Sequence, residues 1–191
     1  VDIDSQTNNM SPKYLEDKLK LAKKNGRLPK VVIPVHLSGQ SCDMKKIHKL
    51  SIEYGFKIIE DASHAIGAKY EGHPVGDCRY SDITVFSFHP VKIITTCEGG
   101  MCLTNNPELS VLIYRYRSHG ITRQPSQMTK IPDGPWYYEQ LDLGLNYRMN
   151  DVQAALGLSQ MSRLDEFVEQ RHHIANRYDE LLSDSIVETP N

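Results

Sequence analysis

The spacing of apolar residues predicts two helices in the first quarter of the chain. Ser11 and Pro12 have the residue types that favour a helix N-cap and first turn, so a helix is predicted from there to about Lys24. A second helix is predicted from Asp43 as N-cap to Gly55 as its end. The inward faces would consist of Leu15, Leu19 and Ala22 in the first helix, and of Met44, Ile47, Leu50 and Tyr54 in the second.

Four short runs between and after these helices have the composition of β-strands. Residues 30–35, "KVVIPV", form a β-branched run that predicts a buried strand, and further strands are predicted at 56–60, 82–88 and 100–104. Strands separated by helices indicate βαβ units. The chain is therefore predicted to be α/β, with three layers and a mainly parallel sheet flanked by helices.

The second half of the chain contains two helical segments around an irregular one. Asn106 and Pro107 predict a helix start, followed by an apolar face and an end near Gly120. Residues 121–146 show little periodicity and include the aromatic cluster 136–138, which favours a functional loop. Helix is predicted again from Asn150 to about residue 184, with Ser162 and Asp165 forming a capping-box-like restart.

Composition limits the classes of function. The chain has 191 residues and a net charge of −2, which suggests one domain or slightly more and argues against nucleic-acid binding. It contains no apolar run of about 20 residues and no recognisable signal peptide, so no membrane span is expected. Its four cysteines form no CxxC pair, and we interpret them as reduced, mostly buried thiols of a cytoplasmic protein. They are Cys42, Cys78, Cys97 and Cys102.

Three polar residues stand at or just beyond the ends of predicted strands, where ligands of open α/β sheets bind. Asp61 follows "FKIIE", Ser87 lies at the end of "DITVFSF", and Lys92 lies in the next turn. A lysine shielded from water has a lowered pKa, and its neutral amine can form a Schiff base with a carbonyl cofactor. The alternative for Lys92 is a side chain that extends from a turn into solvent.

Asp61 and His64 are open to two interpretations each. Asp61 could be a helix cap or turn residue, or a carboxylate that faces the protonated nitrogen of a pyridine ring. His64 could contact the same ring or be a structural histidine. A metal site built from histidines and a cysteine is a weaker alternative, because the spacing of His36, His64, His73 and Cys78 matches no familiar zinc pattern.

Four segments resemble one protein family in order and separation. They are "PVHLSGQSCDM" at 34–44, "IIEDASHAIGAKYEGHPVG" at 58–76, "FSFHPVKIITTCEGGMCLTN" at 86–105 and "GPWYYEQLDLGLNYRMNDVQAALGLSQ" at 134–160. Together they resemble the sugar aminotransferases of the DegT/DnrJ/EryC1/StrS family. The segments "GPWYYE" and "FSFHPVK" most resemble the branch that aminates C4 of a UDP-linked 4-keto-6-deoxy sugar on the way to pseudaminic acid.

The resemblance implies pyridoxal 5′-phosphate (PLP) as cofactor and a role for each matching residue. Lys92 matches the lysine that carries PLP and acts as the catalytic acid and base. Asp61 matches the partner of the pyridine nitrogen, His64 a ring contact and Ser87 a phosphate ligand. Asn146 matches a residue that reaches the phosphate across a homodimer interface, and Arg148 could do the same.

The implied reaction moves an amino group from an amino acid, with glutamate as the expected donor, to a nucleotide-linked keto sugar. Two rivals remain: a non-catalytic binding or scaffold module of the same fold, and a PLP-dependent sugar dehydratase. The family's chains are longer, and Val1 matches a position inside their large domain. We therefore expect residues 1–160 to be part of a large, fold-type-I PLP-binding domain, truncated at both ends, and 161–191 to be a helix leading toward a small domain.

Overall fold

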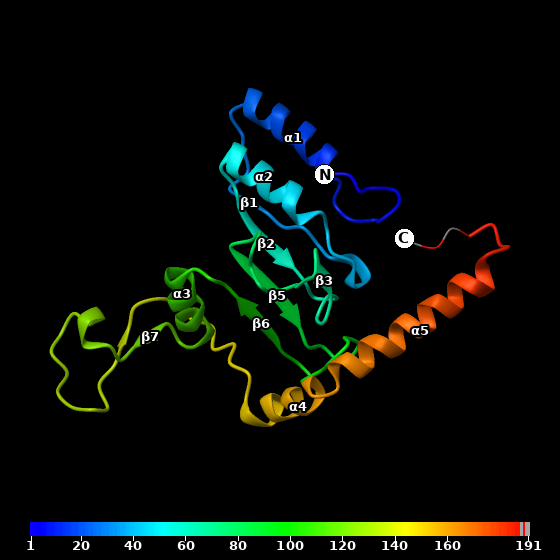
Figure 1. Ribbon diagram of the computed structural model, residues 1–191. Helices are drawn as coiled ribbons and strands as arrows, with labels where there is room; N and C mark the ends of the chain where they lie inside the picture. Colours follow the sequence, from blue (N-terminus) through cyan, green and yellow to red (C-terminus); the bar gives the residue numbers. More distant parts are fainter. Residues whose placement is uncertain (188, 190–191) are drawn as a thin grey trace.

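A four-stranded sheet forms the centre of the molecule (Figure 1). The computed structural model describes residues 1–187 and 189. The strands lie in the order β1 (Val31–Val32), β2 (Lys57–Asp61), β5 (Ile83–Ser87) and β6 (Gly100–Leu103). β1, β2 and β5 are parallel, whereas β6 is antiparallel to β5. Residues 88–99 contain no helix that could carry the chain back to the other end of the sheet, so the chain reverses there. The predicted mainly parallel α/β fold is confirmed.

Two N-terminal helices pack against each other and against the β1 side of this sheet (Figure 1). α1 (Pro12–Lys24) starts as predicted, because the Ser11 hydroxyl accepts a hydrogen bond from the amide of Tyr14. α2 (Met44–Tyr54) has Asp43 as N-cap and Gly55, at φ +77°, as C-cap. The predicted inward residues of α2 are all buried.

The apolar interior consists of two clusters. The first joins α1, α2, β1 and β2 through side chains such as Leu19, Ile47 and Ile58. The second includes Phe86, Phe88 and Ile94 and lies toward the end of β5. Polar groups at the carboxyl ends of β2 and β5 therefore stand beside a packed apolar support.

A projecting arm carries the segment that lacked periodicity. α3 (Pro107–Arg117) follows β6 and is capped by Asn106 as predicted. The arm, residues 121–140, then extends away from the sheet and is closed at its root by β7 (Ile121–Thr122) and β8 (Glu139–Gln140) (Figure 1). A second two-stranded ribbon, β3 (Lys69–Tyr70) with β4 (His73–Pro74), lies between β2 and β5 in the sequence.

The final helical region is two helices, α4 (Asp151–Met161) and α5 (Leu164–Leu182). The restart was predicted at the correct place, but the capping box was wrong. Ser162 is the C-cap of α4 and donates its hydroxyl proton to the carbonyl of Ser159, and no side chain caps α5. The capping box belongs to Asn150 and Gln153 at the start of α4.

Two expectations about burial were wrong. The run 30–35 alternates between exposed and buried residues instead of being buried throughout, because α1 and α2 cover one side of it. Cys42 and Cys78 are buried free thiols, whereas Cys97 and Cys102 are exposed free thiols. In α5, Leu164 and Phe167 pack against the second apolar cluster, whereas Ile174 further along the helix is 52 % exposed. Within the described residues, no helix combines the length and apolar character that crossing a bilayer requires.

Truncation of Ile47 tests the first apolar cluster. Its side chain is fully buried, so Ile47→Ala is expected to lower the free energy of unfolding by about 2–5 kcal/mol in a denaturant titration. Ile52 on the same helix is 74 % exposed, and Ile52→Ala is expected to change the free energy of unfolding by less than about 0.5 kcal/mol. Equal effects of the two substitutions would contradict the described packing of α2.

Candidate functional site

Parallel pairing places Asp61 and Ser87 on the same face of the sheet. Asp61, the last residue of β2, pairs with Val85 of β5. Ser87 lies two residues further along β5, and side chains two residues apart in a strand point to the same face. The carboxylate and the hydroxyl therefore stand at the carboxyl end of the sheet, as the sequence predicts.

The carboxylate of Asp61 is held on one side and open on the other. Its Oδ1 accepts a hydrogen bond of 3.1 Å from the amide of Ser63. Its backbone is fixed by two further bonds, to the carbonyl of Pro34 at 2.9 Å and from the amide of His36 at 3.0 Å. Within residues 1–187 and 189 the other carboxylate oxygen, Oδ2, has no hydrogen-bond donor. This oxygen is available to a ligand.

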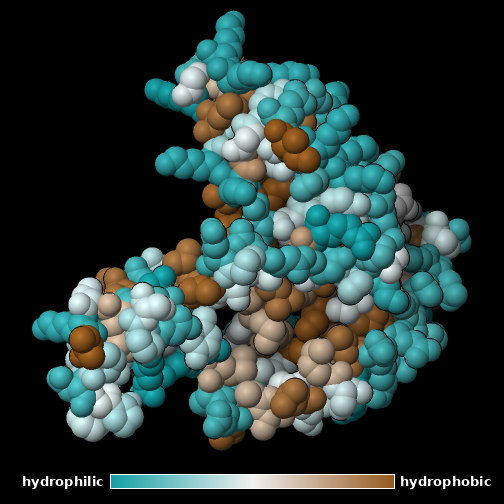
Figure 2. Space-filling model, turned by 60° about the vertical axis from the view of Figure 1, so that its left-hand side comes forward, coloured by the Kyte–Doolittle hydropathy of each residue, from teal (hydrophilic) through white to brown (hydrophobic). Residues whose placement is uncertain are grey.

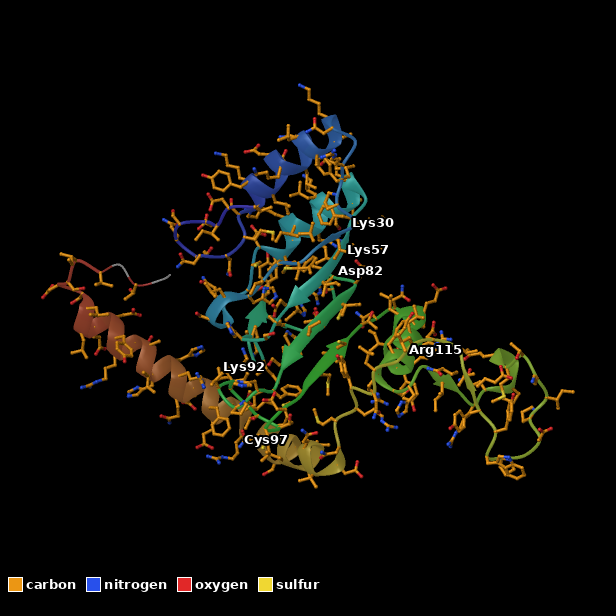
Figure 3. All side chains as sticks on the ribbon, turned by 180° about the vertical axis from the view of Figure 1, so that it is seen from behind. Lys30, Lys57, Asp82, Lys92, Cys97 and Arg115 are labelled. Carbon is orange, nitrogen blue, oxygen red and sulfur yellow. The ribbon has the colours of Figure 1, made fainter. Side chains whose placement is uncertain are left out.

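Lys92 lies in a closed loop, residues 88–99, that begins where β5 ends. Phe88 closes the loop twice: its amide donates to the carbonyl of Gly99 at 2.9 Å, and its carbonyl accepts from the amide of Thr96 at 3.0 Å. Figure 3 places Lys92 at the opposite end of the sheet from Lys57 and Asp82, which stand where β2 and β5 start. Lys92 is only partly buried, so the turn shields it from water less than the sequence suggested. Its amine forms no ion pair within the described part of the chain.

α4 supports this loop from below, which the sequence did not indicate. Gln160 accepts a hydrogen bond of 3.3 Å from the amide of Thr95. Gly157 is buried where a Cβ would come within 2.8 Å of a methyl carbon of Thr96. A glycine within a helical pattern signals such a close approach but does not identify the neighbour.

His64 stands three residues beyond Asp61 and is exposed. Its Nδ1 accepts a hydrogen bond of 3.3 Å from the amide of Ser38. Ala62 and Ala65 on either side are fully buried. The structure thus brings Asp61, Ser87 and the Lys92 loop to one end of the sheet, with His64 in the turn that follows β2.

Asn146 belongs to a different part of the chain. Its amide donates to the carbonyl of Ser118 at 2.9 Å, which holds it beside the end of α3, and its φ is +58°. Its side chain is exposed. No hydrogen bond connects Asn146 with the Lys92 loop within the described chain.

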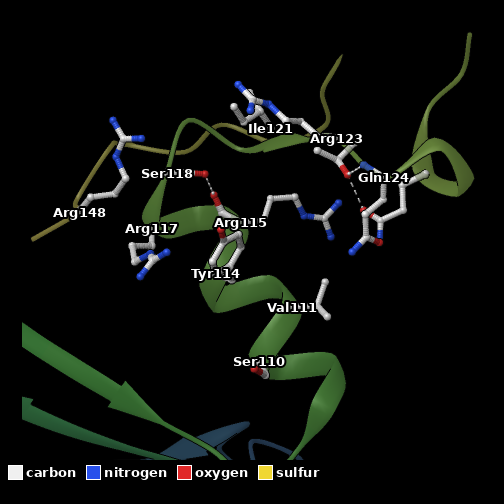
Figure 4. Close-up of a pocket in the computed structure, with 12 residues that line it drawn as sticks. Ser110, Val111, Tyr114, Arg115, Arg117, Ser118, Ile121, Arg123, Gln124 and Arg148 are labelled. Atoms are coloured by element: carbon white, nitrogen blue, oxygen red, sulfur yellow. Dashed lines mark hydrogen bonds between the residues drawn. The ribbon is translucent and has the colours of Figure 1, made fainter. Parts of the chain in front are cut away.

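A cavity of about 650 Å³ lies close to Asn146, between α3 and the root of the arm (Figure 4). Its lining includes four arginines and no acidic residue. Arg115 faces Asp142 at 3.0 Å, and Arg117 stacks on the ring of Tyr114 at 4.6 Å. The others are Arg123 and Arg148. The cavity is cationic and separate from the end of the sheet that carries Lys92.

Solved structures that match this chain include aminotransferases. Helicobacter pylori PseC, an aminotransferase involved in the biosynthesis of pseudoaminic acid, superposes with a TM-score of 0.83 at 30 % identity, covering 97 % of this chain and 45 % of that one. A Streptococcus pneumoniae protein solved in its PLP form gives a TM-score of 0.76 at 29 % identity, covering 97 % of this chain and 48 % of that one.

The sequence identifies the family. The sequence profile of the DegT/DnrJ/EryC1/StrS aminotransferase family matches residues 1–190, and the chain belongs to this family. A Campylobacter jejuni relative, UDP-4-amino-4,6-dideoxy-N-acetyl-beta-L-altrosamine transaminase, is 40 % identical over 171 residues, which are 90 % of this chain and 42 % of that protein. The chain spans less than half the length of the curated relatives it matches.

Gly39 offers a test of the packing around His64. Its φ is +91°, and a Cβ there would stand 3.0 Å from the carbonyl oxygen of His64. Gly55 has φ +77° and no atom within 4 Å of its ideal Cβ, so it is a matched control for backbone strain alone. Gly39→Ala is therefore expected to destabilise the chain by about 1–3 kcal/mol more than Gly55→Ala does, as measured by denaturant unfolding. Equal losses would show that the Gly39–His64 contact is not tight in solution.

Proposed function

We propose that the protein to which this chain belongs is a PLP-dependent aminotransferase. It moves an amino group from an amino acid, glutamate being the expected donor, to the C4 ketone of a nucleotide-linked 4-keto-6-deoxy sugar. The observation that supports this most strongly is the convergence of Asp61, Ser87 and the Lys92 loop at one sheet end in a chain of this family. Because the chain covers less than half of its relatives, the proposal concerns the whole protein.

The groups at the sheet end fit PLP. The free Oδ2 of Asp61 can accept a hydrogen bond from a pyridinium nitrogen, and a carboxylate there favours the protonated ring. Ser87 supplies a hydroxyl for a phosphate oxygen. PLP, when bound, serves as the electron sink for the carbanion that transamination requires.

Lys92 is assigned two tasks. Its Nζ would hold the cofactor covalently, and its free amine would serve as the base and acid that moves the proton of the substrate carbon. Its amine has no carboxylate partner within the described residues, so no ion pair must break before it reacts. A lysine at this position favours transamination over the dehydratase alternative, whose members carry histidine there.

The exact sugar is a narrower part of the proposal. The segments "GPWYYE" and "FSFHPVK" and the similarity to the Campylobacter jejuni transaminase support a substrate of the pseudaminic acid type. We place the enzyme in the cytoplasm. Residues 1–160 would belong to its large PLP-binding domain, and residues 161–191 would lead toward a small domain.

A homodimer with shared active sites accounts for the position of Asn146. This side chain and Arg148 stand beside α3, apart from the Lys92 loop, and would reach the cofactor phosphate of the other subunit. Figure 2 shows hydrophobic side chains gathered around a hollow in the body of the molecule, to the right of the arm. Apolar residues of α4 and of the segment after the arm are also open to solvent: Val152 is 81 % and Tyr147 78 % exposed. Such surfaces favour association.

Borohydride trapping tests the cofactor assignment. The chain is mixed with PLP, reduced, digested and analysed by mass spectrometry. We expect one phosphopyridoxyl group per chain, on the peptide that contains Lys92, and none above background after Lys92→Ala. The control is Lys69→Ala, which removes an exposed lysine from β3 and should leave labelling unchanged. Equal labelling of several surface lysines, with no preference for Lys92, would contradict the proposal and favour a non-catalytic module.

Mixed variants test the shared site. Chains with Lys92→Ala or Asn146→Ala alone are each expected to retain little PLP. In a mixed dimer, one site combines an intact Lys92 with an intact Asn146 from the other chain. Mixing should therefore restore PLP labelling at about half of the sites in each mixed dimer. Labelling of the whole sample will be lower, because random pairing also forms dimers of a single variant. No recovery in chains shown by sedimentation to be dimeric would exclude sharing.

A further inference from the structure

A buried polar network lies directly behind Asp61, among residues to which the proposed function assigns no role. His36 is completely buried and Glu60 is 5 % exposed. The Nε2 of His36 stands 2.8 Å from a carboxylate oxygen of Glu60. The other carboxylate oxygen accepts hydrogen bonds from the hydroxyls of Ser81 and Thr84. An ionisable pair at this depth needs all its partners, because each unpaired group costs about 1–3 kcal/mol.

The hydrogen bonds define the protonation state of His36. The amide of Cys42 donates to Nδ1 of His36 at 3.2 Å, and an amide cannot accept a proton in return. Nδ1 therefore carries the lone pair, and Nε2–H donates to Glu60. Burial acts to raise the pKa of Glu60, but the hydrogen bonds from His36, Ser81 and Thr84 outweigh it and hold the pKa below its ordinary value. The network is a neutral histidine and a carboxylate solvated by three donors.

His36 also begins the turn that contacts two of the proposed cofactor residues. Its own amide donates to the carbonyl of Asp61 at 3.0 Å. Two residues later, the amide of Ser38 donates to Nδ1 of His64 at 3.3 Å. Ser38 has a φ of +55°, a conformation that a serine keeps only where its surroundings enforce it.

A second buried side chain holds the same turn. Asn9 is 3 % exposed, and its side-chain oxygen accepts from the amide of Leu37 at 2.9 Å. Its amide nitrogen donates to the carbonyl of Gln40 at 2.9 Å. The turn 36–40 is thus fixed at its start by His36 and Glu60 and along its length by Asn9, so its amide groups point in set directions.

We propose that the buried His36–Glu60 pair is a positioning device that fixes the turn 36–40 and, through the amides of His36 and Ser38, the end of β2 at Asp61 and the ring of His64. Because Ser38 donates to Nδ1 of His64, neutral His64 carries its proton on Nε2, where it can donate to a ligand. The significance of this orientation for catalysis rests on the proposed function, whereas the coupling itself is a property of the chain without cofactor.

Hydrogen exchange on the cofactor-free chain tests the coupling. The amide of Ser38 reports on the turn. The amide of Ala62, bonded to Val85 at 2.9 Å between β2 and β5, reports on opening of the sheet. In the His36→Leu variant, exchange of the Ser38 amide should accelerate on the order of ten-fold relative to exchange of the Ala62 amide. In Glu60→Asp, which moves the carboxylate away from His36, the acceleration should be smaller. A purely structural loss of stability would accelerate both amides together.

Two further variants serve as controls. Glu60→Gln keeps an acceptor for His36 and is expected to preserve the exchange ratio, since Ser81 and Thr84 can accept from its amide group. Glu71→Gln alters an exposed glutamate that accepts from Lys45 and Tyr80, away from the turn, and should have no effect.

The nitrogen resonances of His64 give a second readout. At about pH 8, where histidine is neutral, the Nδ1 resonance should shift in His36→Leu and Glu60→Asp toward that of the exposed His172. Unchanged exchange at Ser38 and an unmoved His64 resonance in either folded variant would overturn the proposal. If neither variant folds, the wild-type chain decides: exchange at Ser38 as fast as in an unstructured peptide would overturn it, and protection comparable to Ala62 would support it. None of these results depends on PLP trapping at Lys92.

Discussion

The parallel pairing of β2 with β5 is the constraint on which the rest of the site depends. Its register sets Asp61 opposite Val85, and so places Ser87 and the start of the Lys92 loop just beyond the carboxylate. A shift of one residue would turn Asp61 to the opposite face of the sheet. The buried side chains of β2 oppose such a shift, because Ile58 would leave the apolar cluster and Glu60 would lose its donors.

The support of the site comes from both ends of the chain and uses different physics on each side. Behind β2, polar groups in a dry interior hold the turn 36–40 through directional bonds. Beneath the Lys92 loop, α4 and the start of α5 supply close packing, with Gly157 against Thr96 and Phe167 against the second apolar cluster. Hydrogen bonds fix the direction of the groups and packing fixes their distance, and the proposed cofactor site requires both.

Local signals in the sequence predicted the fold well and the contacts poorly. Ser11, Asp43 and Asn106 were recognisable as N-caps because capping depends on a few neighbouring residues. Asp61, Ser87 and Lys92 were placed at strand ends for the same reason. By contrast, Glu60, the carboxylate partner of His36, is 24 positions away, and Thr96, the neighbour of Gly157, is about 60 positions away. Residue spacing does not predict such long-range pairs. The family resemblance indicated which residues belong to the site, but not which neighbours hold them in place.

The root of the arm has a consequence for how relatives can diverge. Gly120 bonds both Leu141 and Asp142 through its carbonyl, and a Cβ on it would collide with the backbone of Asp142. The arm, residues 121–140, therefore begins and ends at the same hydrogen-bonded position. Its tip can lengthen, shorten or change sequence without transmitting a shift to β6 or α4. Relatives can therefore differ in what the tip contacts while the sheet and the proposed site keep their geometry and stability.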